Sequence, residues 1–141
     1  MNLLSERLNR LSPSATLAMS QKSNELKAQG IDIINLSVGE PDFNTPEHIK
    51  EAAKQAIDNN YSRYSPVAGY PELRNAIVKK LKEENGLEYN PTQISCANGA
   101  KQSVCNVIMT LVDNGDEVIV PAPFWVSYPE MVKMANGTPV I

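Results

Sequence analysis

Cysteine is scarce in this 141-residue chain, which contains only Cys96 and Cys105. The two lie nine positions apart and form no CxxC pair, so their spacing favours neither a disulfide framework nor a metal site. We therefore expect two reduced, buried thiols, because free cysteine packs as a small apolar residue. Histidine is scarcer still: His48 is the only one, and a solvated side chain is expected there, in the first turn of an exposed helix.

An excess of positive charge and a long apolar run are also missing. The formal net charge is −3 and the lysines are scattered, which gives no basic surface for nucleic acid or an anionic membrane. No apolar stretch approaches the roughly 20 residues that cross a bilayer. The opening segment MNLLSERLNRLSPS carries charges throughout, unlike a secretory signal. These absences predict a cytoplasmic protein without nucleic-acid or membrane partners.

What the chain does contain is an alternation of strand and helix patterns. Thr45-Pro46 is a typical helix start, with a hydroxyl before a proline, and Asn85-Gly86 is a typical helix end. The alternation predicts an α/β fold with a mainly parallel sheet flanked by helices. We expect helices at 16–29, 46–60, 71–85, 99–112 and 125–135, and strands at 31–36, 94–97, 117–121 and 138–141.

The apolar character of one expected helix and one expected strand predicts a large core. The 99–112 helix is apolar on most sides, and the 117–121 strand is a continuous apolar run, typical of a strand covered on both faces. The chain stops at Ile141 inside a strand pattern whose pairing partners have not appeared. We therefore expect the front part of a longer polypeptide, which alone is marginally stable or associates through exposed apolar surface.

The stretch Asn98-Gly99-Ala100-Lys101 joins the end of one predicted strand to the start of a helix. Free N–H groups at a helix start attract anions, and small residues let an anion approach the backbone. Lys101 adds positive charge, so the turn has the composition of a phosphate site. It matches neither GxGxxG nor the Walker pattern, and tight packing of the helix start against the sheet remains an alternative.

The only tryptophan, Trp125, follows the next predicted strand, after Pro121-Ala122-Pro123-Phe124. Ligands of open parallel sheets bind beyond the carboxyl ends of the strands, so Trp125 and the 99–101 turn are predicted to line one crevice. That geometry favours a planar, phosphorylated ligand, although Trp125 taken alone also fits a core position. The carboxylates Glu40 and Asp42 lie in a turn where local backbone hydrogen bonds are common, and no Ser/His/Asp or metal constellation is present.

Four segments together resemble the class I aminotransferases that use pyridoxal 5′-phosphate (PLP), nearest to their bacterial aspartate aminotransferase branch. The segments are INLSVGEPDFNTPEHIKEAAKQAI, YSPVAGYPELRNAI, NGAKQSV and GDEVIVPAPFWVSYPEM. The similarity extends from about Ser12 onward. It implies the N-terminal part of the PLP-dependent transferase fold, with an arm, helix and short strand at 1–45 and the first part of the large PLP-binding domain at 46–141, truncated at Ile141.

The resemblance also implies roles for particular residues. Gly99, Ala100 and Lys101 match the turn that binds the cofactor phosphate, although close relatives often have glycine at position 100. Trp125 matches the aromatic residue that stacks on the pyridine ring and borders the substrate. Tyr64 matches a tyrosine that reaches the neighbouring subunit's cofactor phosphate, which implies a homodimer.

Substrate contacts follow from the same resemblance. Gly39 matches the glycine whose backbone touches the substrate carboxylate, and Thr16 and Lys101 match positions that help recognise an acidic side chain. The residues before Thr16 resemble an arm that packs on the partner subunit. The implied reaction moves an amino group between an acidic amino acid such as aspartate and a 2-oxo acid such as 2-oxoglutarate, with aromatic and prephenate specificities as alternatives.

The catalytic residues of the resemblance are not in this chain. The lysine that binds the coenzyme covalently, the aspartate on its pyridine nitrogen and the arginine that grips the substrate α-carboxylate would all follow Ile141. We therefore expect no catalytic residue within 1–141 and no transamination by the chain alone. A stand-alone phosphate-binding α/β module and a non-catalytic remnant of the family are the alternative interpretations.

Overall fold

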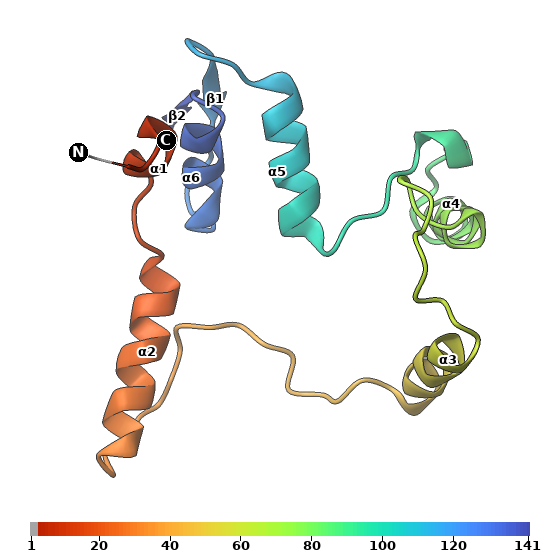
Figure 1. Ribbon diagram of the computed structural model, residues 1–141, viewed down its shortest axis with the longest axis horizontal. Coiled ribbons are helices and arrows are strands. Elements are labelled where there is room, and N and C mark those ends of the chain that lie inside the picture. The colour runs from red at the N-terminus through yellow and green to blue at the C-terminus, as the bar shows by residue number, and fades with distance from the viewer. Residues whose placement is uncertain (1–2) are drawn as a thin grey trace. The chain divides into compact units, whose positions relative to one another are not determined.

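The computed structural model describes residues 3–141, and Figure 1 shows the order of their helices and strands. These residues divide into two compact units. One unit contains the described residues up to Glu40 together with Val104–Ile141, and the other is Pro41–Ser103. The arm, the sheet and its crossover helix belong to the first unit, and two amphipathic helices belong to the second.

The first unit is built around a β–α–β motif. Strand β1 (Glu117–Ile119) leads into helix α6 (Ser127–Met134), which returns the chain to strand β2 (Thr138–Val140). The strands pair in parallel, with Glu117 opposite Thr138 and Ile119 opposite Val140, and the Val120 amide extends the ladder by donating to the Val140 carbonyl at 2.8 Å. The expected parallel sheet is therefore confirmed.

The buried residues of this unit lie on α6 and at the end of β1. Val132 is fully buried, and the other buried side chains are Val120, Met131 and Ala135. Gly137, between α6 and β2, has no room for a side chain. A Cβ there would lie 2.5 Å from the Val112 side chain and 3.1 Å from Val132. Helices α1 (Glu6–Asn9) and α2 (Ala15–Ala28) precede this motif, and α1 contacts α6.

The second unit consists mainly of helices that begin and end at local signals. They are α3 (Glu47–Asp58), α4 (Pro71–Asn85) and the 3₁₀ helix η1 (Pro91–Gln93). Gly86 ends α4 with φ +67°, a conformation that glycine adopts without steric cost. The predicted helices at 46–60 and 71–85 are confirmed to within two residues. Helix α5 (Ala100–Leu111) starts in this unit and continues into the first.

Two predicted strands are wrong. Residues 31–36 and 94–97 have no regular secondary structure. A strand is stable only when its backbone groups are paired, and the described residues offer 31–36 no partner strand; Ile34 and Leu36 are 85% and 89% exposed. The Cys96 amide instead donates to the Ala68 carbonyl at 3.0 Å, which ties the 94–97 segment to a loop.

Helix α5 and strand β1, for which burial is expected in a larger core, are largely exposed within the described residues. No α5 residue is buried, and Ile119 on β1 is 78% exposed. The sheet has only two strands within residues 3–141, so it offers little surface against which α5 could be buried. Cys96 and Cys105 are free thiols, as predicted, but half-buried. Within the same range, no helix has the length and hydropathy needed to cross a membrane.

Candidate functional site

The Asn98–Lys101 turn has an open backbone at the start of α5. Gly99 has φ +85°, and its carbonyl accepts hydrogen bonds from the amides of Gln102 (3.2 Å) and Ser103 (3.4 Å). A Cβ at Gly99 would meet nothing within 4 Å. Ala100 and Lys101 form the exposed first turn of the helix. The turn therefore offers an accessible helix N-terminus with a lysine beside it.

Gln102 is a residue of this turn that the sequence analysis missed. Its side-chain Oε1 accepts a hydrogen bond from the Asn98 amide at 2.6 Å, so the side chain holds the approach to the helix in place. The sequence signal is only partial: a capping-box glutamine bonds to the amide three positions back, whereas Gln102 bonds to Asn98, four positions back.

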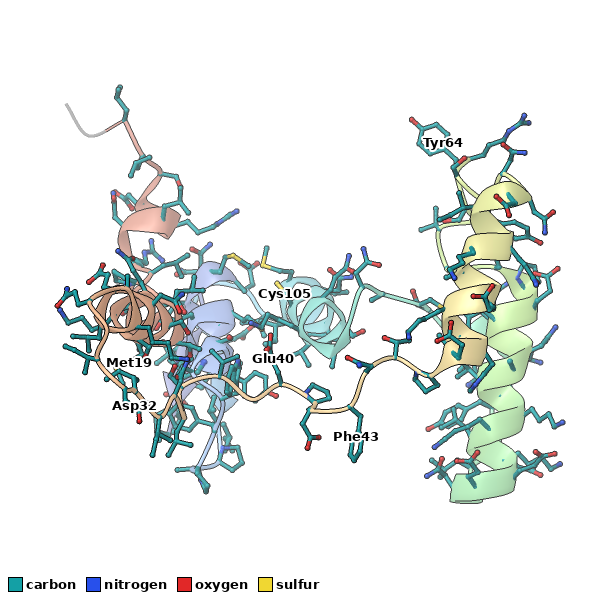
Figure 2. The ribbon with its side chains drawn as sticks, turned by 90° about the horizontal axis from the view of Figure 1, so that it is seen from below. Met19, Asp32, Glu40, Phe43, Tyr64 and Cys105 are labelled. Carbon is teal, nitrogen blue, oxygen red and sulfur yellow. The ribbon has the colours of Figure 1, made fainter. Side chains whose placement is uncertain are left out.

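A cavity of about 310 Å³ lies beside the turn and belongs wholly to the second unit. Its lining is largely polar and comes from the loop after Tyr64, the first turns of α4 and α5 and the segment before α5: Ser65, Pro66, Val67, Gly69, Tyr70, Leu73, Cys96, Ala97, Asn98 and Gln102. The structure thus brings the loop that follows Tyr64 next to the segment that leads into Gly99. The Tyr64 ring itself is fully exposed and projects away from α3 and α4 (Figure 2).

Trp125 and Thr16 lie in the first unit, at the starts of two helices. Trp125 lies two positions before α6 and is 44% exposed, so it is not a core residue; its carbonyl accepts the Tyr128 amide hydrogen at 3.0 Å. Thr16 is half-buried in the first turn of α2. That helix is capped by the Ser14 hydroxyl, which accepts a hydrogen bond from the Leu17 amide at 3.3 Å.

A second cavity, of about 260 Å³, joins these two helix starts. One wall is Ser12, Pro13, Ser14 and Ala15, and the other is Val126, Ser127 and Glu130. Thr16 directly follows the first wall and Trp125 directly precedes the second. The structure therefore places the segments that carry these two predicted residues on opposite sides of one cavity.

Glu130 connects the two walls, and the sequence analysis missed it. Its Oε2 accepts the Ser12 amide hydrogen at 2.8 Å, and its Oε1 accepts a hydrogen bond from Lys133 Nζ at 2.8 Å. Partial burial by itself would raise the pKa of Glu130, but the hydrogen bonds from Lys133 and Ser12 and the Lys133 charge outweigh it and lower the pKa from its usual value. No sequence signal marks a contact between residues 118 positions apart.

The remaining candidates are exposed. Gly39 lies in an irregular segment, where an added Cβ would meet nothing within 4 Å, and it lines neither cavity. Glu40 and Asp42 are exposed beside it, and His48 is exposed in the first turn of α3, as predicted. The 99–101 turn belongs to one unit and Trp125 to the other, so their shared crevice stays a prediction.

Residues 31–141 match the family described as aminotransferase class I and II. This match covers most of the chain. The chain belongs to the class I and II aminotransferase family. The resemblance stated from the sequence motifs is therefore confirmed at the level of the family.

Individual aminotransferases are similar over almost the whole chain. An aspartate/prephenate aminotransferase of Cereibacter sphaeroides is 51% identical over 99% of this chain, and an aspartate aminotransferase of Bacillus sp. strain YM-2 is 49% identical over 98%. The solved structure of Thermus thermophilus aspartate aminotransferase with maleate is 48% identical over 99% of the chain, with a TM-score of 0.93. The predicted fold class is confirmed.

The chain is much shorter than these relatives. It spans 35% of the Cereibacter and Bacillus aminotransferases and 37% of the Thermus structure. The aligned portion of this chain contains all of the predicted site residues, from Thr16 to Trp125.

Proposed function

We propose that this chain supplies part of the cofactor and substrate site of a PLP-dependent aminotransferase acting on an acidic amino acid, aspartate, and a 2-oxo acid, 2-oxoglutarate. The observation that carries the proposal is the match over 31–141 combined with an open, lysine-bearing helix start at the Gly99–Lys101 turn. The similar relatives are named for aspartate or for aspartate and prephenate, which supports an acidic substrate.

The residues of the 99–101 turn fit a phosphate group. The space next to Gly99 is unfilled, the helix start presents backbone N–H groups, and Lys101 provides a positive charge. Gln102 ties the segment before the turn to α5 through the Asn98 amide, which limits the movement of the helix start. Ala100 keeps its backbone donor and therefore serves in place of glycine.

The other site residues have roles that match their positions. Trp125, exposed before α6, stacks on the pyridine ring, and the exposed Tyr64 reaches the cofactor phosphate of a second copy in a homodimer. Gly39 presents its backbone to the substrate carboxylate. Thr16 and Lys101 bind the acidic side chain of the substrate. The protein acts in the cytoplasm.

PLP, when bound, supplies an electron-withdrawing ring that stabilises negative charge on the substrate. The part of the work proposed for this chain is to bind the phosphate, stack the ring and orient the substrate. The chain covers about a third of its relatives, and none of its lysines lies in a sequence context like that of the covalent cofactor site. We therefore propose that the chain alone does not transaminate.

The binding proposal can be tested with the single tryptophan. Titration with pyridoxamine phosphate is expected to quench Trp125 fluorescence saturably, and pyridoxamine, which lacks the phosphate, is expected to bind far more weakly. Neither ligand has an aldehyde, so stray lysine adducts cannot imitate binding. Lys101→Ala should weaken the phosphate-dependent quenching, whereas Lys27→Ala, at the exposed end of α2, should not.

Equal responses to the two ligands would contradict the assignment of the 99–101 turn as the phosphate site. The lack of activity is tested separately, by incubating the purified chain with PLP, aspartate and 2-oxoglutarate. Glutamate formation is expected to stay at the level of a boiled control. Turnover clearly above that level would overturn the proposal that the chain is inactive alone.

A further inference from the structure

The N-terminal segment, residues 3–14, makes two hydrogen bonds to α6 and to the turn that ends it. Ser12 donates its amide hydrogen to Glu130 Oε2 at 2.8 Å, and Arg10 Nη1 donates to Asn136 Oδ1 at 3.1 Å. Both acceptors belong to α6 or to the turn that ends it. A backbone donor on a charged acceptor makes the first contact the stronger of the two.

The Ser12–Glu130 contact lies within the 260 Å³ cavity and bridges its two walls. Ser12 is followed by Pro13, whose ring restricts the backbone, and by the Ser14 cap of α2. Only three residues separate Ser12 from Thr16, so fixing the Ser12 amide limits where Thr16 can lie. On the other wall, Glu130 lies in the first turn of α6, the helix that starts two positions after Trp125.

A second glutamate shows that this contact is not a routine feature of a helix start. Glu47 and Glu130 both lie in the first turn of a helix, and each pairs with a lysine three positions later, at 2.9 Å and 2.8 Å. The Glu47 side chain is 70% exposed and that of Glu130 is 27% exposed. Glu130 differs because its second oxygen accepts a hydrogen bond from another segment.

We propose that Glu130 is a positioning residue: by accepting the Ser12 amide hydrogen, it fixes the start of α2 against α6 and so sets the separation of Thr16 and Trp125. Its importance for substrate binding rests on the proposed function, but the positioning itself does not. The charged group that acts on Glu130 directly is Lys133 on α6. Helix α1, which contacts α6, carries Glu6 and Arg7, and Arg10 follows at its end.

The test follows the Ser12 amide by NMR in the ¹⁵N-labelled chain. In the wild type, its proton shift is expected to change as Glu130 is protonated, and this titration should disappear in Glu130→Gln. In Glu130→Ala, exchange of the Ser12 amide with solvent should be about tenfold faster or more, as expected for loss of a hydrogen bond to a charged group. Acrylamide quenching of Trp125 should rise in the same variant.

Glu47→Gln and Glu47→Ala are the matched controls, because each removes the equivalent lysine pair without touching the N-terminal segment. They are expected to leave both the Ser12 amide and Trp125 unchanged. If Glu130→Ala fails to fold, the wild-type titration and Glu130→Gln still decide the question. A Ser12 amide that is insensitive to pH and to Glu130→Gln would overturn the proposal.

These readouts need no cofactor, so they separate this proposal from the proposed function. Phosphate-dependent ligand binding with no response of Ser12 to Glu130 variants would overturn the positioning role and leave the function standing. A Ser12 response without phosphate-dependent binding would support the positioning role and count against the function.

Discussion

The contacts inside the two units of this chain are of different kinds. In the unit that contains the sheet, segments far apart in sequence meet: β1 pairs with β2, α1 contacts α6, and four side chains are buried. In Pro41–Ser103, all of which is described, no residue is buried. Helices α3 and α4 still form there, which shows that local signals suffice for a helix and that burial requires distant segments.

The local signals of the second unit can be identified residue by residue. Pro71 opens α4 at the position where its missing N–H costs nothing, and Gly86 ends it. Lys50, Lys54, Lys79 and Lys80 pair with glutamates three or four positions away. Each such exposed pair adds only a few tenths of a kcal/mol, so this unit is expected to be the less stable of the two.

The strongest test of the comparison is Val132→Ala. Val132 is fully buried on α6, so its truncation is expected to lower the free energy of unfolding of its unit by about 2 to 3 kcal/mol. Ile57→Ala on α3 is the control, because Ile57 is 75% exposed and its loss should cost less than about 0.5 kcal/mol. Urea denaturation monitored by Trp125 fluorescence measures the first, and hydrogen exchange assigns each change to a unit. Similar losses for the two variants would contradict the comparison.

Gly69→Ala probes the tertiary contact of the second unit. Gly69 and Gly86 both have positive φ, but a Cβ at Gly69 would lie 2.7 Å from Cys96 Sγ, whereas one at Gly86 meets nothing within 4 Å. Both substitutions incur the backbone penalty, and only Gly69→Ala adds a clash. We expect it to cost about 1 to 2 kcal/mol more than Gly86→Ala, measured by hydrogen exchange of α4. Equal costs would show that the Gly69–Cys96 contact is unimportant.

The smallest expected effect concerns pH. Because the pKa of Glu130 is lowered in the folded chain, the carboxylate stabilises the fold above its unfolded-state pKa, about 4.5, and this contribution is lost as the pH falls through the lower, folded-state value. The stability difference between wild type and Glu130→Gln should therefore shrink on acidification below about pH 4.5. It is measured by urea denaturation at several pH values, with Glu47→Gln as control. A difference that is independent of pH would show that the Glu130 charge does not hold the segment.

The sequence predicted the helices well because their signals are local. Thr45-Pro46, Pro71 and Gly86 marked helix ends, and the structure places those ends within two residues. The prediction of strands failed at residues 31–36 and 94–97. Their sequences have strand patterns, but they have no pairing partner within the described residues. A strand, unlike a helix, satisfies its hydrogen bonds outside itself, so a local pattern cannot establish that it forms.

The residues of the candidate site also fall into those that local sequence patterns reveal and those that depend on distant contacts. The Gly99–Lys101 turn and Trp125 were identified from residue types at predicted helix starts, and the structure places both at helix starts with exposed surfaces. Gln102 was partly within reach of the same reasoning, because it lies in the first turn of a predicted helix and bonds to the backbone only four positions back. Glu130 was not, because its role depends on Ser12, 118 positions away.

By itself, the sequence determined the family, the helix boundaries and the parallel strand–helix–strand order, since each depends on residues that are neighbours along the chain or on motifs that can be matched directly. Only the tertiary structure decided which apolar side chains are buried, that β1 pairs with β2, and that the N-terminal segment is held by Glu130. These depend on the distance between segments that the chain separates by many residues, and that distance is set by packing.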